Sequence, residues 1–284
     1  MNIISGKEVA GHISKRVKDR IDELIKQGKR VPKLVIVRVG DRPDDLSYQR
    51  GAIKRMDMVG IAHKELWFEE NVSKEAFYEK FDEINKDDEV DGILVLRPLP
   101  KHLDEERLIR TINQAKDVDA ISPISLGKIM IGDKNGFAPC TAAGVIEILK
   151  YAGVEIGSKK VTIVGRSNVV GRPLALLFIG LDATVTVCHS RTKDVKEACK
   201  NAEILVASCG KARFINKEYV SSGAVVIDVG INLDEERKLC GDVDTESIEG
   251  IAYACTPVPG GVGAVTTSVL ASHVLCAYEN ALKV

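Results

Sequence analysis

Short apolar runs alternate with helix-forming segments along most of this chain. In the first half, apolar residues recur at helical spacing from Val9 to Ile25, and the compact run Leu34-Val35-Ile36-Val37 follows a turn that contains proline. This alternation predicts a mostly parallel sheet covered by helices, because parallel strands are joined by crossover connections that are usually helical. The other elements expected in this half are helices at 47–58 and 73–85 and strands at 65–68 and 92–96.

The alternation begins again near Lys159, in a pattern typical of a Rossmann-type nucleotide-binding domain. A helix expected at 145–151 links the two halves, and the terminal helix after Val265 is expected to return to the first half. We therefore predict an α/β protein with two domains, a first domain of residues 1–144 plus 266–284 and a dinucleotide-binding domain of residues 145–265. The elements expected in the second domain are strands at 160–164, 184–188, 204–208 and 224–229, a short strand near residue 251, and helices that begin at 172 and 193.

The charges of the chain nearly cancel, with 40 basic against 41 acidic residues. This balance argues against nucleic acid or an anionic membrane as a partner, so we expect a small-molecule ligand. The apolar stretch from Val265 to Leu282 contains Ser268, His273 and Glu279, which predicts a packed helix and not a membrane span.

The cysteine pattern indicates a reducing compartment. Seven cysteines, an odd number, are scattered without C-x-x-C or paired metal-binding spacing, as is usual for the thiols of cytosolic enzymes. Lys7 and Glu8 follow the first six residues directly, which argues against a signal peptide. We therefore expect a cytoplasmic protein without a bound metal.

A glycine-containing loop joins an apolar run to a helix at the start of the second domain. The loop is Gly165-Arg166-Ser167-Asn168-Val169-Val170-Gly171-Arg172-Pro173. Helix N-termini carry unpaired N–H groups and a partial positive charge, and glycine lets a phosphate approach the backbone closely. The G-x-G-x-x-G fingerprint is absent, so a tight connection without a ligand remains the alternative to a nucleotide site.

The end of the next expected strand bears on the choice of nucleotide. NAD-specific domains place a carboxylate there to bind the ribose hydroxyls, whereas this strand ends Cys188-His189-Ser190-Arg191-Thr192. A cation and hydroxyl groups suit a phosphate, and Arg166 adds a second cation at the turn. NADP is therefore favoured over NAD; the alternative is that Arg166 and Arg191 are solvated surface charges.

A second glycine loop lies near the end of the chain. It reads Thr256-Pro257-Val258-Pro259-Gly260-Gly261-Val262-Gly263, so two prolines stiffen it and three glycines keep side chains out of the way. The composition of this loop predicts a wall against a flat ligand.

The two loops and several shorter motifs resemble the methylenetetrahydrofolate dehydrogenase/cyclohydrolase family, the FolD proteins. The motifs cover nearly the whole chain in the same order, and the proline-glycine loop is highly specific. The further matching segments are Asp91-Gly92-Ile93-Leu94-Val95, Pro98-Leu99-Pro100-Lys101-His102, Lys116-Asp117-Val118-Asp119, Pro139-Cys140-Thr141, Thr186-Val187-Cys188-His189-Ser190 and Gly241-Asp242-Val243.

The resemblance implies a cytosolic homodimer that oxidises 5,10-methylenetetrahydrofolate to 5,10-methenyltetrahydrofolate with NADP and often hydrolyses that product to 10-formyltetrahydrofolate. The folate site would lie in a cleft between an N-terminal α/β folate-site domain and a Rossmann-type NADP-binding domain. Tyr48 would stack on the aminobenzoyl ring, and Asp119 would hold the pterin. The loop containing Pro257, Gly260 and Gly261 would close over the folate. The implied cofactor-binding residues are Gly165, Arg166, Ser167, Val170, Gly171, Ser190, Arg191 and, near the nicotinamide, Ile231.

The chain departs from the family pattern at the catalytic lysine. The family has a tyrosine, three residues and a lysine on one helix that ends in Gly-Ile or similar. Alignment backwards from Gly60-Ile61 puts Tyr48 at the tyrosine position and Ala52 at the lysine position. Lys54 is the candidate catalytic residue nearby, although two residues along a helix rotate a side chain by roughly 200°. Lys54 could serve only if the helix began late or carried a bulge.

A second departure falls where the family usually has glutamine, because this chain has Leu96, followed by Arg97. Hydride loss from the methylene carbon is assisted by the two flanking nitrogens and needs no general base, whereas hydrolysis needs groups that activate water and move protons. We therefore expect a working dehydrogenase with weak or absent cyclohydrolase activity. The alternatives are a fully bifunctional enzyme in which Lys54 or Arg97 serves, a dehydrogenase of another small substrate, and a non-catalytic folate- or nucleotide-binding protein.

Overall fold

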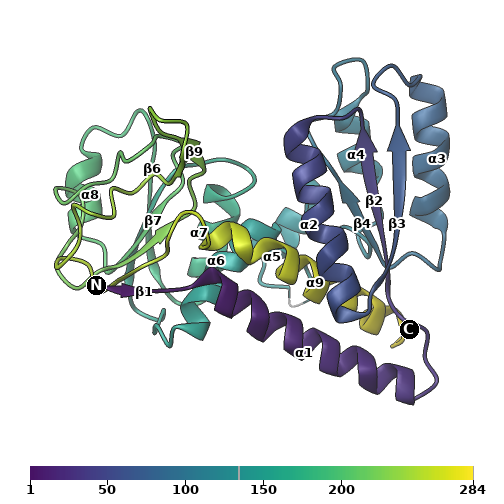
Figure 1. The fold of residues 1–284 in the computed structure, drawn as a ribbon, viewed down its shortest axis with the longest axis horizontal. Coiled ribbons are helices and arrows are strands. Elements are labelled where there is room, and N and C mark those ends of the chain that lie inside the picture. The colour runs from purple at the N-terminus through teal and green to yellow at the C-terminus, as the bar shows by residue number, and fades with distance from the viewer. Residues whose placement is uncertain (134, 284) are drawn as a thin grey trace. The chain divides into compact units, whose positions relative to one another are not determined.

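The computed structural model describes residues 1–133 and 135–283, and the chain divides into two compact units. Met1–Ala10 and Thr141–Thr266 make up one, called here the six-stranded unit. Gly11–Cys140 and Thr267–Val284 make up the other, the three-stranded unit. Figure 1 shows the elements of both. The chain passes from one unit to the other within α1 (Gly6–Lys26), at the start of α6 (Cys140–Tyr151) and at the start of α9 (Thr266–Ala281).

The six-stranded unit contains a parallel sheet of order β6-β5-β7-β8-β11-β1. The side chains of β7 and β8 are buried along their whole length, as expected for strands covered by helices on both faces. The strands of this sheet are β1 (Asn2–Ile3), β5 (Lys160–Val164), β6 (Thr184–Cys188), β7 (Ile204–Ala207), β8 (Val225–Asp228) and β11 (Ala254–Cys255). The remaining elements are α7 (Gly171–Ile179), α8 (Val195–Lys200), the antiparallel pair β9 (Asn232–Leu233) and β10 (Leu239–Cys240), and the 3-10 helix η1 (Val262–Ala264).

The strand order of the six-stranded unit reverses at β5. The chain leaves β5 through α7 to reach β6 on one side, and β7 lies on the other side of β5. Ligands of open α/β sheets bind outside the carboxyl ends of the strands at such a reversal. The segments that follow β5 and β7 are therefore the expected place for a nucleotide.

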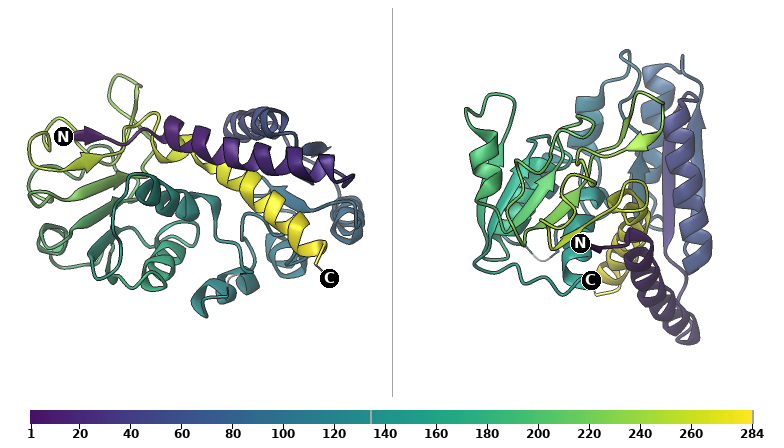
Figure 2. Two further views of the ribbon diagram at one scale, coloured as in Figure 1. Left: turned by 90° about the horizontal axis from the view of Figure 1, so that it is seen from below. Right: turned by 60° about the vertical axis from the view of Figure 1, so that its left-hand side comes forward.

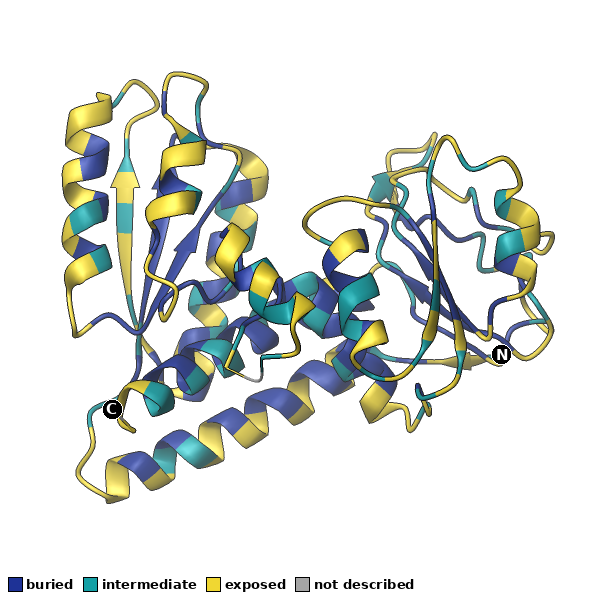
Figure 3. Cartoon of the chain, turned by 180° about the vertical axis from the view of Figure 1, so that it is seen from behind, coloured by how far each residue is buried: buried dark blue, intermediate teal, exposed yellow. Residues whose placement is uncertain are grey.

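The three-stranded unit contains a parallel sheet of order β3-β2-β4. In Figure 3, β2 and β4 are largely buried, while β3 at one edge shows exposed residues along its length. The strands are β2 (Lys33–Val39), β3 (Ala62–Phe68) and β4 (Gly92–Val95). The helices are α2 (Pro43–Val59), α3 (Lys74–Lys86), α4 (Glu105–Thr111) and α5 (Pro123–Met130), together with most of α1 and α9.

Alternate residues of β2 and β4 face opposite sides of this sheet. Val35, Val37 and Val95 pack with Phe77 and Phe81 of α3 in one apolar cluster, so Ile36, Leu94 and Leu96 point to the other side. A fully buried aliphatic or aromatic side chain contributes roughly 1.5–3 kcal/mol to folding, which makes this cluster the main anchor of the sheet.

α1 and α9 lie side by side in the three-stranded unit (Figure 2). Ser14 and Ser268 are joined through their hydroxyls at 3.3 Å, and Arg20 Nε donates to Glu279 Oε1 at 2.6 Å. None of the helices in the ranges 1–133 and 135–283 is both long and apolar enough to cross a membrane.

The predicted fold class, an α/β protein of two domains with parallel sheets, is confirmed. The short strand expected near residue 251 lies at Ala254–Cys255, while β1, α4, α5 and the β9–β10 pair had not been predicted. The domain limits 1–144 plus 266–284 and 145–265 stay a proposal. The compact units differ from these limits at the N-terminus, because β1 pairs with β11 and Met1–Ala10 therefore belongs to the six-stranded unit.

Candidate functional site

The loop after β5 packs against the end of β7 so closely that it excludes side chains. Gly165 has a φ of +140°, and a Cβ there would lie 2.2 Å from the carbonyl oxygen of Ser208. A Cβ on Gly171 would lie 2.1 Å from the carbonyl oxygen of Gly165. Both glycines are thus required to bring the start of α7 to the strand-order reversal, an arrangement of backbone that can bind an anionic ligand.

Ser167 and Arg166 are exposed where this loop leads into α7. The Ser167 hydroxyl accepts from the backbone N–H of Val170 at 3.1 Å, which folds the loop back before the helix begins. The guanidinium of Arg166 is therefore available beside the positive end of α7, where phosphate oxygens are favoured.

A tight turn displays Ser190 and Arg191 at the end of β6. The backbone N–H of His189 donates to Thr192 Oγ1 at 3.0 Å, and the backbone N–H of Arg191 donates to His189 Nδ1 at 3.1 Å. His189 thus shapes the turn, while the Ser190 and Arg191 side chains are exposed. The structure brings these two and the loop after β5 to neighbouring strand ends, because β5 pairs with β6 from Lys160 to Val164.

A buried carboxylate holds the segment after β7; it belongs to the matching segment Gly241-Asp242-Val243, for which the sequence predicted no role. Asp242 is completely buried, and its two oxygens accept the backbone N–H groups of Cys209 at 2.6 Å, Gly210 at 3.0 Å and Lys211 at 2.8 Å. Asn232 Nδ2 donates to the same carboxylate at 2.9 Å. Asp242 therefore couples this loop to β9.

Asp228, at the end of β8, forms a second buried anchor. Its carboxylate accepts from the backbone N–H groups of Gly230, Asp242 and Val243 at 2.9 to 3.0 Å. Burial, which is only partly opposed by these hydrogen bonds, raises the pKa of Asp228 to about 6. Its backbone N–H donates to Thr256 Oγ1 at 2.8 Å, which ties the strand to the proline-glycine loop.

Ile231 is held out from this framework, with 69% of its surface exposed. The preceding residue must be glycine, since a Cβ on Gly230 would lie 2.3 Å from Asp242 Cγ. Ile231 Cδ1 would lie 3.8 Å from a Cβ on Gly263, so the side chain stands beside the proline-glycine loop. An apolar side chain presented in this way suits contact with the face of a planar ring.

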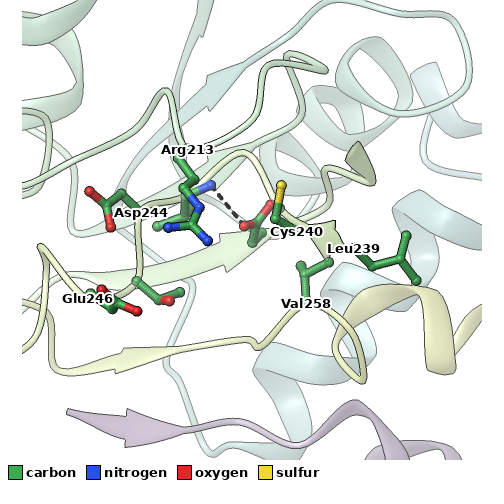
Figure 4. Close-up of a pocket in the computed structure, with 10 residues that line it drawn as sticks. Arg213, Leu239, Cys240, Asp244, Glu246 and Val258 are labelled. Carbon is green, nitrogen blue, oxygen red and sulfur yellow. Dashed lines mark hydrogen bonds between the residues drawn. The ribbon is translucent and has the colours of Figure 1, made fainter. Parts of the chain in front are cut away.

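A small pocket lies behind the same framework (Figure 4). It has a volume of about 100 Å³, and the backbone N–H of Arg213 donates to the Gly241 carbonyl at its edge, at 3.0 Å. Since one water molecule occupies about 30 Å³ of liquid, this pocket has room for a few waters and not for a dinucleotide.

The proline-glycine loop closes on itself and on the N-terminus. The Gly6 backbone N–H donates to the Gly260 carbonyl at 2.9 Å, and Gly260 has a φ of +99°. A Cβ on Gly261 would lie 2.4 Å from the carbonyl oxygen of Pro257. The loop is thus compact and its shape depends on its glycines, while its role as a wall against a flat ligand stays a prediction.

In the three-stranded unit, Tyr48 and Ala52 lie one turn apart on α2. Tyr48 is half-buried and Ala52 is completely buried, whereas Lys54 is exposed. α2 runs without interruption from Pro43 and ends at Gly60, whose backbone N–H donates to the Met56 carbonyl at 2.9 Å. Neither a late start nor a bulge brings Lys54 to the Ala52 side of the helix.

Leu96 and Arg97 follow β4. Leu96 is only 6% exposed, and its backbone N–H donates to the Val37 carbonyl at 2.9 Å. Arg97 Nη1 lies 3.1 Å from Glu105 Oε1, and the other oxygen of Glu105 accepts from the Leu99 backbone N–H at 2.9 Å. α4, which had not been predicted, thereby holds the Arg97 side chain.

Asp119 is half-buried, and its Oδ1 accepts from the backbone N–H of Cys140 at 2.9 Å. Burial raises the pKa of this carboxyl, and hydrogen bonds from Cys140 together with the charges of His273 and Arg97 oppose the rise. The turn that contains it is fixed by Asp117, which is completely buried and accepts from Ile121, Ser122 and Ser125.

A buried cation near α2 was also missed. Arg38 of β2 is 8% exposed, and its Nε donates to Gln49 Oε1 at 2.8 Å. Its Nη1 contacts the Gly40 carbonyl and Asp41. The available signal was a single arginine inside the apolar run of β2, one that must be paired when buried.

The two domains of one enzyme family together match this chain over most of its length. Residues 4–119 match the tetrahydrofolate dehydrogenase/cyclohydrolase catalytic domain, and residues 139–282 match the NAD(P)-binding domain of the same enzymes. The bifunctional protein FolD of Clostridioides difficile is 49% identical over 280 residues, which cover 98% of this chain and 97% of the relative.

Solved structures give the same result. FolD methylenetetrahydrofolate dehydrogenase/cyclohydrolase from Campylobacter jejuni superposes with a TM-score of 0.95 at 34% identity, over 99% of both chains. The Trypanosoma brucei enzyme, solved with NADP and an inhibitor, superposes with a TM-score of 0.93 at 33% identity, over 99% of this chain and 98% of the other.

Proposed function

Because this chain belongs to the tetrahydrofolate dehydrogenase/cyclohydrolase family, we propose that it oxidises 5,10-methylenetetrahydrofolate to 5,10-methenyltetrahydrofolate with NADP and has weak or no cyclohydrolase activity. The burial of Ala52 on an uninterrupted helix, with Lys54 exposed, is the observation that carries the restriction. The related proteins named above are bifunctional, so this chain would differ from them in one of two activities.

The cofactor fits the six-stranded unit. The backbone cradle at Gly165 and Gly171 would receive the pyrophosphate, since a Cβ at either position would collide with backbone. Val170 belongs to the same loop, and Arg166 and Ser167 would contact phosphate oxygens from its exposed side. NADP supplies the hydride acceptor, and Ile231 would pack against its nicotinamide ring.

The 2′-phosphate of NADP would be bound by Ser190 and Arg191. Their turn presents a hydroxyl and a guanidinium in the place where NAD-specific domains have a carboxylate. A charge-assisted bond to phosphate is stronger than one between neutral groups, so this turn favours NADP over NAD.

The folate-binding residues that the sequence predicts are Tyr48, Asp119, Pro257, Gly260 and Gly261. Tyr48 would stack on the aminobenzoyl ring and Asp119 would accept hydrogen bonds from the pterin. The loop containing Pro257, Gly260 and Gly261 would form a rigid wall against the folate, as its glycine contacts allow. Oxidation needs the methylene carbon held in attack geometry, for which positioning alone is worth roughly 7 to 11 kcal/mol.

Hydrolysis requires acid–base groups in addition to a correctly positioned substrate. Water must be activated and protons moved as the ring opens, and positioned acid–base groups accelerate such steps by about 10²- to 10⁴-fold. Ala52 and Leu96 offer no titratable group. Arg97 is engaged by Glu105, and a guanidinium does not release its proton near neutral pH. Neither Lys54 nor Arg97 is therefore placed to replace the lysine and glutamine of the family.

One assay separates this proposal from its alternatives. Purified protein is mixed with NADP and 5,10-methylenetetrahydrofolate, and the absorbance of NADPH and of the methenyl product is followed. Turnover supports the proposal, reduction of NADP with other substrates and without folate supports a different dehydrogenase, and binding without turnover supports a non-catalytic protein. Repeating the assay with NAD tests the cofactor.

We also propose a cytoplasmic homodimer. All seven cysteines are free thiols, as in a reducing compartment. β3 pairs only with β2 among the described residues, and Trp67 on this edge strand is 47% exposed, which makes the edge a suitable surface for a second copy. Light scattering on the purified protein tests the proposed dimer, and Trp67→Lys should then yield monomers.

A further inference from the structure

Three segments of the three-stranded unit meet at Asp119. Val118 and Asp119 lie between α4 and α5, Cys140 begins α6, and His273 lies in the middle of α9. His273 Nδ1 is 2.8 Å from the Val118 carbonyl oxygen and 3.9 Å from Cys140 Sγ. The backbone N–H of Cys140 donates to Asp119 Oδ1 at 2.9 Å. Residues distant in sequence thus surround one carboxylate.

The contact between His273 and Val118 shows which ring nitrogen of His273 carries a hydrogen. A carbonyl oxygen only accepts, so His273 Nδ1 carries a hydrogen and donates to it, in either charge state of the ring. Because Nδ1 is the donor, it does not accept a proton from the Cys140 thiol. That thiol is itself protonated, since burial beside Asp119 raises its pKa well above the ordinary value.

The Cys140 thiol therefore has two acceptors within its surroundings. Its Sγ is 3.7 Å from the Val118 carbonyl oxygen, and Asp119 is its other hydrogen-bonding partner. The Val118–Asp119 peptide is thus held at its carbonyl by His273, and the Asp119 carboxylate is held by Cys140. Among residues 1–133 and 135–283, Cys140 alone donates to that carboxylate, which leaves Oδ2 for a ligand.

We propose that His273 is a positioning residue of the folate site, which aims the Asp119 carboxylate at the pterin by holding the Val118 carbonyl. This inference rests on the proposed role of Asp119. The amino-pyrimidinone edge of a pterin presents two adjacent N–H donors, and an ionised carboxylate is the acceptor that matches both. A rotation of the Val118–Asp119 peptide would displace Oδ2 from that edge.

The surroundings of His273 favour a fixed ring. Phe137 lies 5.1 Å from the imidazole, measured between ring centroids, and the ring is half-buried. A group that can donate from the Nδ1 position would preserve the bond to Val118, whereas a group that reaches only the Nε2 position would not. The amide nitrogen of asparagine can occupy the Nδ1 position and that of glutamine the Nε2 position, so the two substitutions form a matched pair.

The test compares His273→Asn with His273→Gln. We expect His273→Gln to weaken tetrahydrofolate binding and to raise the KM for methylenetetrahydrofolate by about ten-fold, as for the loss of one hydrogen bond. His273→Asn should stay within about two-fold of wild type, because its amide N–H replaces Nδ1–H. The KM for NADP should not change in either variant. Ser272→Ala, at the half-buried neighbouring position of α9, serves as the control.

The affinity for tetrahydrofolate is also measured by calorimetry without NADP, so that the role of His273 is tested independently of catalytic turnover. Equal affinities of the Asn and Gln variants would overturn the role of His273, as would a parallel rise in the KM for NADP. If wild type binds tetrahydrofolate and Asp119→Asn weakens binding while His273→Gln does not, only the role of His273 fails. If wild type neither binds tetrahydrofolate nor oxidises the substrate, the proposed function fails, and this inference with it.

Discussion

Ala52 and Lys54 stand two residues apart on α2, yet Ala52 is completely buried and Lys54 is exposed. A regular helix rotates by roughly 100° per residue, so the two side chains leave the helix on nearly opposite sides. The ammonium group of Lys54 therefore cannot occupy the place of a side chain at position 52 without loss of helical structure. This relationship is the basis for expecting one activity where relatives have two.

Restoring the family's lysine at position 52 and its glutamine at position 96 should restore cyclohydrolase activity. In Ala52→Lys with Leu96→Gln, we expect the rate of methenyltetrahydrofolate hydrolysis to rise by about 100-fold or more, the contribution of a positioned acid–base group. The dehydrogenase rate should change little. Lys54→Ala is the matched control and should leave both rates unchanged. A double variant that is folded, binds folate and still fails to hydrolyse would mean that other groups are missing.

The preference for NADP should depend on Arg191. Arg191→Ala should raise the KM for NADP by about 10- to 100-fold, since a hydrogen bond to a charged group is worth roughly 1.5–3 kcal/mol. The KM for NAD, which has no 2′-phosphate, should stay the same. Lys193→Ala removes a nearby exposed cation and is the control. Equal losses for both nucleotides would show that Arg191 supports the turn and does not read the phosphate.

The affinity for folate should depend on pH through Asp119. Burial raises the pKa of this carboxyl, and the ionised form is the one that accepts from the pterin. As the pH falls through that raised pKa, the protonated fraction grows, so the KM for methylenetetrahydrofolate should rise on the acid side. Steady-state kinetics at a series of pH values below neutral measure this effect. Asp119→Asn should give a high KM that no longer varies with pH.

Asp228 should make the fold less stable as the pH rises. Its pKa is raised from 3.8 to about 6, so the folded state binds more protons than the unfolded state between these values. Its stabilising contribution is complete below 3.8 and is lost as the pH rises through 6, a loss on the order of 3 kcal/mol for two pKa units.

Urea unfolding at several pH values, compared between wild type and Asp228→Asn, measures this dependence. The variant should show a flatter dependence of the unfolding free energy on pH. It should also be less stable at every pH, because an amide cannot accept all three backbone N–H groups. Glu249→Gln, at an exposed position, should behave as wild type. If the pH dependence of the unfolding free energy were the same in Asp228→Asn as in wild type, a group other than Asp228 would be its cause.

Periodic apolar patterns were enough to predict the main helices and strands, because each element buries one face or both. The strands β2, β4, β5 and β7 are compact apolar runs, and the sequence shows them directly. β1 is two residues long and exposed, and it forms because Ala254 and Cys255 lie beside it. Nothing local in residues 2–3 signals such a partner.

The candidate site likewise contains some residues that the sequence predicted and others that it did not. Gly165 and Gly171 were predicted from a loop between an apolar run and a helix, where each glycine approaches backbone atoms too closely for a side chain. Asp242, Arg38 and His273 were not, since their roles depend on contacts with segments 10 to 155 residues away. A charge inside an apolar run was visible at Arg38, but its partner Gln49 becomes apparent only in the folded chain.

The most direct test of the central claim uses purified protein and chemically prepared methenyltetrahydrofolate. Loss of methenyl absorbance is followed with and without protein, beside the rate at which the same preparation oxidises methylenetetrahydrofolate with NADP. We predict rapid oxidation and hydrolysis no faster than in buffer alone. Hydrolysis that is fast and proportional to protein concentration would contradict the claim that Ala52 and Leu96 remove the second activity.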